Sequence, residues 1–367
     1  MKNSAFIPTF GNRPNPLVGR DEILADFMEG LEHPEGHPHR STIIKGQRGT
    51  GKTAILLEIA DRAEKMGYIA VCVTANEKML DEILQFLIVK SEKLTSKKKG
   101  VKGMNAGAFG FSVGFTFTDE VQQNMGFRLK LTLIADELAK KKRGILILVD
   151  EVLANSPQMR ELAVTYQHLI GEGKNIAIAI AGLPAAISSV MNDDILTFLN
   201  RAHKVELHPL ALNEISLFYS DRFAGEGKAI DAETLDYIVR STFGYPYLVQ
   251  LIGYYILKYA RDANIIEDSV AQSAVISATR ELVDSVHKTC LKPLSDKDRA
   301  FLKAMSKDNE SSSMADIQAR MNVSPAYIQQ YRNRLIESGV ILSGQRGRVE
   351  FAVPYLGEYL RGEIGVD

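Results

Sequence analysis

The segment between Gly46 and Thr53 has the residue types and the spacing for binding nucleotide phosphates. It matches G-x-x-x-x-G-K-[ST] at every fixed position and reads Gly46-Gln47-Arg48-Gly49-Thr50-Gly51-Lys52-Thr53. In this spacing the glycines let backbone N–H groups curl around a β-phosphate. The lysine reaches the β- and γ-phosphate oxygens, and the threonine hydroxyl is a ligand for Mg²⁺. We therefore predict that the whole segment binds ATP together with Mg²⁺.

The second half of such a site is an acid at the end of a hydrophobic strand. The apolar run Ile145–Val149 is followed by Asp150 and Glu151. Because ligands of open α/β sheets gather at the carboxyl ends of the strands, Asp150 is predicted to join Thr53 as a Mg²⁺ ligand and Glu151 to polarise the attacking water. In the alternative interpretation Asp150 only caps the next turn, and Glu151 matters little because the site switches without much hydrolysis.

Alternating apolar runs and helical patterns predict the elements that position these residues. Up to about residue 210, β-branched runs predict the strands of a parallel sheet buried on both faces. They are Thr42–Lys45, Ile69–Thr74, Ile145–Val149, Ile176–Ala181 and Lys204–Leu207. Residues 212–288 have helical patterns throughout, and three helices and a hairpin then follow in the order of a winged helix-turn-helix. We therefore predict an α/β P-loop NTPase core at 1–210 with an insertion at 96–118, an α-helical lid at 211–290 and a winged helix at 291–367.

The composition excludes several classes of protein. With 45% hydrophobic residues, 28 Gly and 12 Pro in 367 residues, the chain is too apolar for a disordered protein and too poor in Gly and Pro for a fibrous one. No apolar run of about 18 residues predicts a membrane helix, and the N-terminus lacks the apolar core of a signal peptide. With two cysteines, we expect a cytoplasmic protein with reduced thiols. The net charge of −1 gives no sign of a nucleic-acid partner for the chain as a whole.

The order of these motifs resembles that of the AAA+ and STAND ATPases, in particular the branch of the archaeal origin-recognition initiators. The resemblance covers most of the chain and includes Pro16-Leu17-Val18-Gly19-Arg20-Asp21, which is similar to the N-terminal box of that family. The backbone of the family's box lines the adenine pocket, which implies nucleotide contacts at Val18, Gly19 and Arg20. The resemblance also implies a slow ATP hydrolase whose ATP or ADP state sets the arrangement of its domains, and a nucleotide-dependent homo-oligomer.

Three further positions are compared with the family through this resemblance. The strand Ile176–Ala181 is followed by Gly-Leu, where the family carries a polar sensor of the γ-phosphate. Arg201 is similar to the arginine finger that reaches the γ-phosphate of a neighbouring subunit, although the helix dipole alone also favours an arginine at a helix end. Gly244-Tyr245-Pro246 resembles the G-x-P of STAND switches, whose proline packs on the adenine, but Pro246 could simply start a helix. The family's initiators also carry an arginine sensor near this segment, and residues 244–250 contain no arginine. The two missing sensors favour a slow switch over a fast motor.

The last segment predicts a helix that reads DNA. Ser324 and Pro325 mark its start, while Ile328, Tyr331 and Leu335 recur at helical spacing and should face the core. Amide and guanidinium groups on the outer face are suited to base edges, and arginines of the wing to phosphates. The predicted DNA contacts are Gln329, Gln330, Arg332, Asn333, Arg334, Arg346 and Arg348. However, winged helices also dock proteins, and residues 296–367 hold ten basic and ten acidic residues, so no bulk field favours DNA.

Two clusters stand apart from this scheme. The insertion has a lysine cluster followed by four phenylalanines that would share one face of a hairpin: Phe109, Phe111, Phe115 and Phe117. It could contact nucleic acid, pack on its own domain, join subunits or be a flexible insertion. His33, His37 and His39 are close enough in sequence to suggest a metal site. Their connection is rich in Pro and offers no carboxylate except Glu35, so we expect no metal there.

The sequence thus predicts an ATP-binding AAA+/STAND-like ATPase with Lys52, Glu151 and Arg201 as its catalytic residues. In this prediction the nucleotide controls a switch that binds double-stranded DNA through the winged helix. Two alternatives stay open. One is a signalling or assembly switch in which the winged helix locks ADP, and the other is a protein remodeller without DNA affinity.

Overall fold

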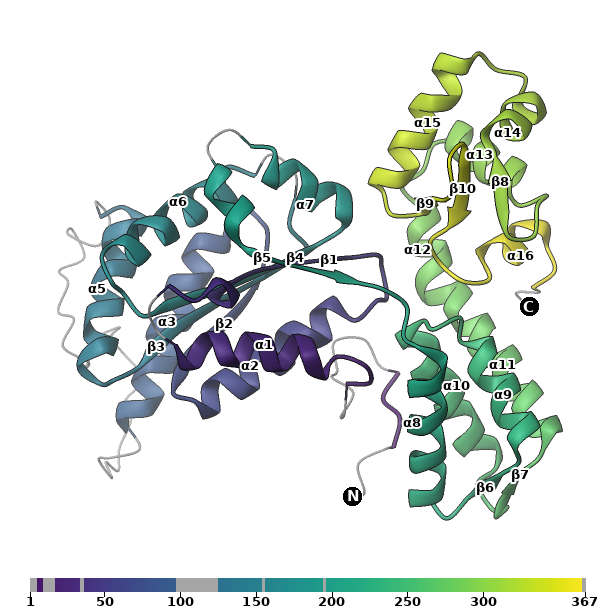
Figure 1. Cartoon of the computed structure of the whole chain (residues 1–367), viewed down its shortest axis with the longest axis horizontal. Helices are drawn as coiled ribbons and strands as arrows, with labels where there is room; N and C mark the ends of the chain where they lie inside the picture. Colours follow the sequence, from purple (N-terminus) through teal and green to yellow (C-terminus); the bar gives the residue numbers. More distant parts are fainter. Residues whose placement is uncertain are drawn as a thin grey trace, which may run out of the picture.

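The structure is a computed structural model that describes residues 5–8, 17–33, 36–96, 125–153, 156–193 and 196–364. Figure 1 shows three parts that follow one another along the chain: an α/β core, a helical lid and a small C-terminal domain. From residue 97 on, the predicted insertion with its phenylalanines lies outside the described residues. None of the described helices combines the length and the hydropathy needed to cross a membrane.

A five-stranded parallel sheet in the order β2-β3-β4-β1-β5 forms the centre of the core. Its strands are β1 (Ser41–Gly46), β2 (Tyr68–Thr74), β3 (Gly144–Asp150), β4 (Ile176–Gly182) and β5 (His203–Leu207). Every residue of β3 and β4 is buried, which explains why these strands are apolar without alternation. Because β1 pairs with β4, which pairs with β3, the loop after β1 lies at the same sheet edge as the end of β3.

Helices cover both faces of this sheet (Figure 1). One face packs against α1 (Asp21–Glu32) and α2 (Lys52–Lys65). The other face packs against α3 (Met79–Ser96), α5 (Phe127–Lys140), α6 (Pro157–Gly171) and α7 (Pro184–Met191). Two short 3-10 helices, η1 (Pro38–Arg40) and η2 (Thr197–Arg201), lead into β1 and β5. The predicted α/β P-loop NTPase core is confirmed by this architecture.

Four helices form the lid around a hydrophobic core of its own. They are α8 (Leu212–Gly225), α9 (Ala232–Ser241), α10 (Pro246–Tyr259) and α11 (Asp268–Leu282). The prediction of helices alone missed a parallel pair of two-residue strands, β6 (Ala229–Ile230) and β7 (Ile265–Ile266), because such short strands carry no periodicity. Phe6 also fills the lid core. It fits against Gly253 of α10, where a Cβ would lie 2.2 Å from the Phe6 ring.

One continuous helical rod joins the lid to the C-terminal domain. α11 runs without a break through a π-helical turn, η3 (Val283–His287), into α12 (Lys288–Leu291). We refer to these three elements together as the rod. The C-terminal domain starts directly after it, at the capping box that Ser295 and Asp298 form at the start of α13.

The C-terminal domain has the element order of a winged helix-turn-helix. Its elements are α13 (Asp296–Met305), β8 (Ser311–Ser313), α14 (Met314–Met321), α15 (Pro325–Glu337), β9 (Ile341–Ser343), β10 (Arg348–Phe351) and α16 (Leu356–Arg361). The strands form an antiparallel sheet in the order β8-β10-β9. Ile328, Tyr331 and Leu335 of α15 are buried, as their spacing predicts. The boundaries near residues 210 and 290 stay a prediction.

His287 lies at the joint between the rod and the C-terminal domain and gives stability there a pH dependence. Its Nε2–H donates to the backbone oxygen of Pro354 at 2.8 Å, and its side chain is fully buried. Burial lowers the pKa of His287 from 6.5 to about 4. The unfolded chain therefore takes up this proton at higher pH than the folded protein, and stability falls as the pH decreases through that window.

We expect His287→Gln to show a shallower loss of stability between about pH 6.5 and 4 than the natural protein, because glutamine can donate to Pro354 without titrating. The measurement is urea unfolding at a series of pH values. His168→Gln, a change of an exposed histidine on α6, is the matched control. If both variants keep the slope of the natural protein, His287 is not the group that titrates.

Candidate nucleotide-binding site

The phosphate-binding loop, Gly46–Thr53, connects the end of β1 to the start of α2. Gly49 and Gly51 have φ angles of 72° and 91°, a left-handed conformation that residues with a Cβ rarely adopt. At Gly46 a Cβ would lie 2.6 Å from Thr50 Oγ1. The path of the loop therefore requires these glycines. It leads to the amino end of α2, where unpaired backbone N–H groups and the helix dipole favour an anion.

Lys52 folds back over this loop. Its Nζ donates to the backbone oxygens of Gly46 at 2.8 Å and Gln47 at 2.7 Å. Burial lowers the pKa of the Lys52 ammonium group to about 8, although the nearby Asp150 carboxylate favours the charged form. Both hydrogen bonds of Lys52 go to neutral carbonyl oxygens. Negatively charged phosphate oxygens would be stronger partners for the same cation.

Thr53 and Asp150 come from different elements and meet at the carboxyl edge of the sheet. Thr53 Oγ1 donates to Asp150 Oδ2 at 2.5 Å, and Asp150, the last residue of β3, is only 7% exposed. Glu151 follows with a φ of 53° and an exposed side chain, and its N–H donates to Asp150 Oδ1 at 2.9 Å. A hydroxyl and a carboxylate side by side form a donor set that fits Mg²⁺. The two predicted metal ligands therefore lie together.

A cavity of about 460 Å³ lies over the loop, and the core, the lid and the rod all line it. From the core come residues 48–53 of the loop, Asp150, Glu151 and the predicted box residues Leu17, Val18 and Arg20. The lid and the rod contribute Pro246, Tyr247, Gln250, Ser285, Thr289 and Cys290. This volume is typical of small-molecule sites. Most of the predicted nucleotide contacts, Val18, Arg20 and Pro246 included, line this cavity, whereas Gly19, Gly46 and Gln47 do not. The motifs give no sign of the rod, whose lining residues belong to none of them.

The predicted N-terminal box braces the phosphate-binding loop. Arg20 is 9% exposed, and its Nη2 donates to the backbone oxygen of His208 at 2.9 Å and to that of Thr50 at 3.5 Å. Burial lowers the pKa of Arg20, and the neighbouring Glu214 carboxylate opposes that effect. Gly19 has a φ of 62°, and a Cβ there would lie 2.5 Å from Glu214 Oε2. Arg20 therefore ties the box to the loop and to the segment after β5, in addition to lining the cavity.

Tyr245 joins the lid to the phosphate-binding loop. Its hydroxyl donates to the backbone oxygen of Arg48 at 2.9 Å, and a Cβ at Gly49 would lie 1.9 Å from the same hydroxyl oxygen. Burial raises the pKa of Tyr245 above its ordinary value, so the hydroxyl remains protonated and can donate. Tyr245 occupies the variable position of the Gly-x-Pro segment, which is why the motif did not single it out.

The C-terminal domain also reaches this loop. At Gly339, just after α15, a Cβ would lie 2.9 Å from Gln47 Oε1 and 3.1 Å from Leu183 Cδ2. Gln47 Oε1 is buried without a hydrogen-bond partner among the described residues. α15 itself lies on the side of its domain that contacts α7 (Figure 1). The loop is therefore in contact with the lid and with the C-terminal domain at once.

The position compared with the arginine finger lies apart from the cavity, and the position compared with the γ-phosphate sensor lacks a polar side chain. Arg201 is exposed at the end of η2 and does not line the cavity of its own chain. Gly182 and Leu183, at the end of β4, do line the cavity and carry no polar side chain. The cavity therefore lacks a polar side chain at the sensor position, and Arg201 could reach a nucleotide only in a neighbouring copy.

The predicted DNA contacts differ in their surroundings. Gln329, Gln330 and Asn333 are exposed on α15, with Gln329 Nε2 donating to Asn333 Oδ1 at 3.0 Å. Arg334 instead donates through Nε to Asp298 Oδ1 at 2.9 Å and lies over the Tyr331 ring. Arg332 and Arg348 donate to serine hydroxyls of their own domain. Arg346 is exposed and forms no hydrogen bond or ion pair within the described part of the chain.

At the level of sequence, only the C-terminal part of the chain matches a known family. Residues 284–360 match a family model described as a domain of unknown function (DUF8462). The comparison with curated proteins gives no match.

The fold, in contrast, is similar to solved structures over nearly its whole length. A Walker-type ATPase of Pyrococcus abyssi has a TM-score of 0.68 at 14% identity, over 95% of this chain and 97% of that one. The ORC2 protein of Aeropyrum pernix, in ADPNP–ADP complexes, has a TM-score of 0.65 at 14% identity, over 97% and 96%. Cdc6p from Pyrobaculum aerophilum has a TM-score of 0.51 at 15% identity, over 98% of both chains. The chain therefore has the fold of these P-loop proteins: a parallel-sheet core, a helical lid and a C-terminal winged helix-turn-helix.

Proposed function

We propose that this protein is an ATP-dependent switch that hydrolyses ATP slowly and binds double-stranded DNA through its winged helix. One observation carries the proposal: a single cavity is lined by the core, the lid and the rod, and Lys52, Thr53 and Asp150 are among its lining residues. A ligand there would contact the core, the lid and the rod, and the rod carries the C-terminal domain, so its binding could change how these parts are arranged. The similar structures described as a Walker-type ATPase and as ADPNP–ADP complexes support a nucleotide as that ligand.

The polar residues that line the cavity have separate roles in ATP hydrolysis. Lys52 exchanges the carbonyl oxygens of the loop for β- and γ-phosphate oxygens. Thr53 and Asp150 hold Mg²⁺, which when bound neutralises charge on the phosphates. Glu151 accepts the proton of the attacking water while that oxygen bonds to the γ-phosphorus and the bond to the β–γ bridging oxygen breaks. Val18 and Pro246, which line the same cavity, contact the adenine.

A slow rate follows from the end of β4, which offers no polar side chain to the γ-phosphate. In this proposal Arg201 of a neighbouring copy supplies the missing cation, and the protein assembles when ATP is bound. Light scattering with and without ATP tests the assembly. If the protein stays monomeric in both conditions, Arg201 cannot contact the nucleotide of a second copy, and this role is contradicted.

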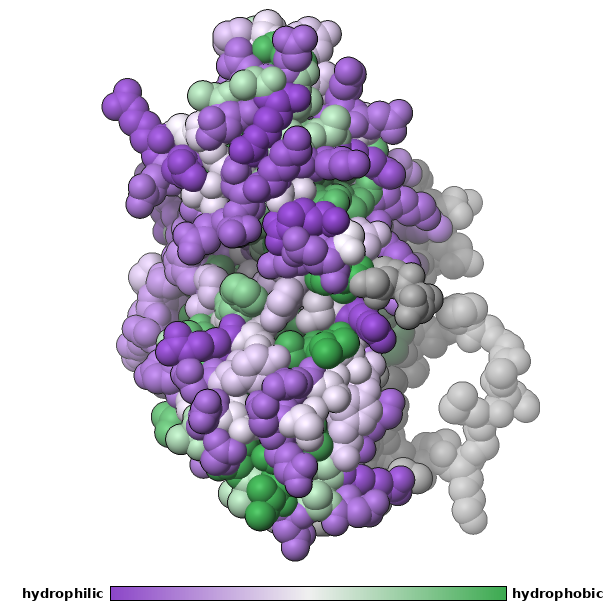
Figure 2. Space-filling model, turned by 90° about the vertical axis from the view of Figure 1, so that its right-hand side faces the viewer, coloured by the Kyte–Doolittle hydropathy of each residue, from purple (hydrophilic) through white to green (hydrophobic). Residues whose placement is uncertain are grey.

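Binding of DNA rests on the winged helix-turn-helix and on the polar face of α15. Three of the predicted arginines have partners within their own domain, so the unpaired Arg346 on the wing and the exposed amides of α15 are the groups most available to DNA. Figure 2 shows that the face formed by the lid and the C-terminal domain is largely hydrophilic, with its hydrophobic side chains in separate patches. A protein remodeller would need a broader apolar surface for its substrates than this face offers.

We expect Arg346→Ala to weaken binding of a labelled DNA duplex several-fold and to reduce the slope of log Kd against log salt by about one, because one phosphate contact is lost. Fluorescence anisotropy at several salt concentrations, with ATP present, measures both quantities. Arg261→Ala, a change of an exposed arginine in the lid, is the matched control. Identical binding by the two variants contradicts the role of the wing. No binding of DNA by the natural protein would favour the assembly switch instead.

A further inference from the structure

A cluster of metal-ligating side chains lies at the edge of the sheet opposite to the phosphate-binding loop. β1 and β5 pair in parallel with Thr42 opposite His203, so the amino ends of both strands meet. His39 stands in η1, just before β1, and α1 runs alongside with Asp26. Because β1 spans six residues, the cluster is roughly 20 Å from the nucleotide site. It therefore lies apart from the proposed Mg²⁺ ligands.

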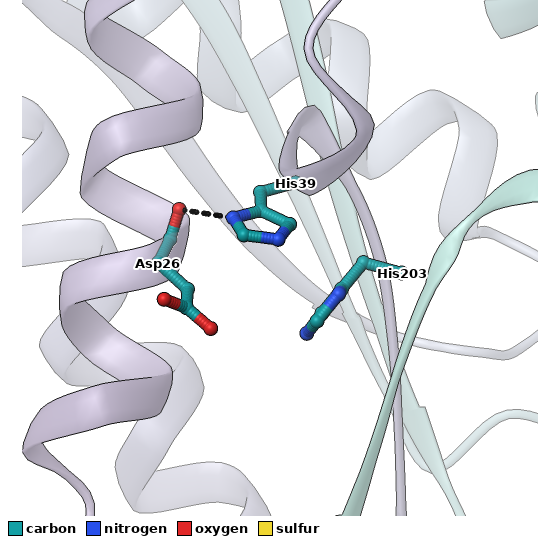
Figure 3. Close-up of side chains that lie close together, drawn as sticks. All are labelled: Asp26, His39 and His203. Carbon is teal, nitrogen blue, oxygen red and sulfur yellow. Dashed lines mark hydrogen bonds between the residues drawn. The ribbon is translucent and has the colours of Figure 1, made fainter.

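The three side chains converge from three separate elements (Figure 3). One ligand atom from each of Asp26, His39 and His203 lies within 4.8 Å of those of the other two. The two imidazole rings have centroids 4.3 Å apart and an interplanar angle of 64°. All three residues are half-buried, so water has only partial access to the space between them.

The hydrogen bond of His39 prepares its ring for a metal ion. His39 Nδ1 lies 2.9 Å from the backbone oxygen of Asp26, which can only accept, so Nδ1 carries the proton (Figure 3). The other nitrogen, Nε2, then has its lone pair free for a metal. Metal-binding histidines in proteins show this pattern, in which a carbonyl or carboxylate fixes the tautomer and the ring orientation.

Close packing fixes the position of His39 relative to α1. At Gly30 of α1 a Cβ would lie 2.9 Å from His39 Cβ and 2.9 Å from the His39 carbonyl carbon. α1 can therefore approach η1 this closely only because Gly30 has no side chain. On the far side, His37 and Glu29 form with His39 a second group of ligand atoms within 4.8 Å of one another. His39 is thus shared by both groups.

We propose that Asp26, His39 and His203 bind a divalent transition-metal ion of the zinc type, with water or His37 as a fourth ligand. Two imidazoles and one carboxylate suit such an ion and not Mg²⁺ or Ca²⁺, which prefer oxygen ligands. Zinc holds such ligands at about 2.0–2.1 Å in a tetrahedron, which places the ligand atoms roughly 3.3 Å from one another. Small side-chain rotations therefore close the site.

The bound ion would connect α1 directly to β5 and to η1, which leads into β1. α1 begins immediately after Arg20, which braces the phosphate-binding loop, and β1 leads into that loop. The ion would therefore hold together the two elements that carry the core side of the cavity. This role is structural, and the site is predicted to bind metal whether or not the protein binds nucleotide.

The test uses the full chain without an affinity tag, freed of metal by a chelator. Titration with Zn²⁺ followed by calorimetry is expected to show one saturable site, and Co²⁺ is expected to give the visible absorption bands of a tetrahedral complex. His39→Ala and His203→Gln should each lower Zn²⁺ affinity by about tenfold or more. His168→Ala, a change of an exposed histidine on α6, should leave affinity unchanged. An excess of Mg²⁺ should not displace Zn²⁺ from this site.

Further variants distinguish this site from the second group, which is formed by Glu29, His37 and His39. His37→Ala should lower affinity less than His203→Gln does, and Lys52→Ala should retain Zn²⁺ binding, which separates this result from any failure of the nucleotide site. Circular dichroism of each variant confirms that it folds. The proposal is overturned if the natural protein and His168→Ala show no saturable Zn²⁺ site. It is also overturned if loss follows His37→Ala while His203→Gln binds normally.

Discussion

Lys52→Ala is expected to abolish ATP binding and with it ATP hydrolysis. Lys52 is the half-buried cation over the phosphate-binding loop, and its hydrogen bonds go to the carbonyl oxygens of Gly46 and Gln47 until phosphate oxygens replace them. Without its charge, the phosphates would meet Asp150 and Glu151 with no lysine to balance them. The natural protein should gain about 2.7 kcal/mol of stability when ATP is at a hundred times its Kd, and the variant none. Thermal unfolding with and without ATP–Mg²⁺ measures this difference.

Lys65→Ala, a change of an exposed lysine at the far end of the same helix, is the matched control and should respond to ATP like the natural protein. In the absence of nucleotide, Lys52→Ala should lose little stability, because the cost of burying the charged lysine offsets its two hydrogen bonds to the loop. A variant that still gains stability from ATP would show that the loop does not bind the phosphates as proposed.

Gly49→Ala is expected to separate the lid from the phosphate-binding loop. A Cβ at residue 49 would lie 1.9 Å from the Tyr245 hydroxyl oxygen, and the backbone there has a φ of 72°. Steric overlap of this kind costs about 1–3 kcal/mol, and the left-handed backbone about 1–2 kcal/mol more. The lid should therefore move away, losing the bond from Tyr245 to Arg48 and lowering ATP affinity by about tenfold or more. Urea unfolding and calorimetry with ATP measure the two effects.

The lid itself provides a control for the backbone cost alone. Gly227 has a φ of 71°, and a Cβ there would meet nothing within 4 Å. Gly227→Ala should therefore lose about 1–2 kcal/mol of stability and keep its ATP affinity. Adding Tyr245→Ala to Gly49→Ala removes the overlap and should restore part of the lost stability. If the double variant is no more stable than Gly49→Ala, the new side chain at residue 49 does not clash with Tyr245.

The core and its phosphate-binding loop could be predicted because their signals are local. β3 and β4 are buried on both faces and therefore appear as uninterrupted apolar runs. The positions of Gly46, Lys52 and Thr53 are fixed by the chemistry of phosphates and Mg²⁺ and not by distant contacts. Asp150 could be placed because parallel strands present their carboxyl ends at one edge.

The remaining contacts depend on how separate parts of the chain pack, and no local pattern records that. Tyr245 and Gly339 meet the loop only because the lid and the C-terminal domain lie against the core. The histidine segment seemed to lack ligands because its partners, Asp26 and His203, come from α1 and from the start of β5. Arg334 was assigned to DNA from its helical position, whereas the structure pairs it with Asp298 of α13.

The rod that joins the lid to the C-terminal domain is a continuous helix, which acts as a stiff beam between them and not as a flexible linker. At 1.5 Å per residue, residues 268–291 form a helix roughly 36 Å long. Thr289 and Cys290, which line the nucleotide cavity, stand at the end of this beam that carries α13. A tilt of about 10° about its lid end would displace that end by about 6 Å, which exceeds the roughly 3.4 Å rise of one DNA base pair. In the proposed switch, a small change in the cavity wall would thus be enough to shift α15 by more than one base-pair step along a groove of DNA.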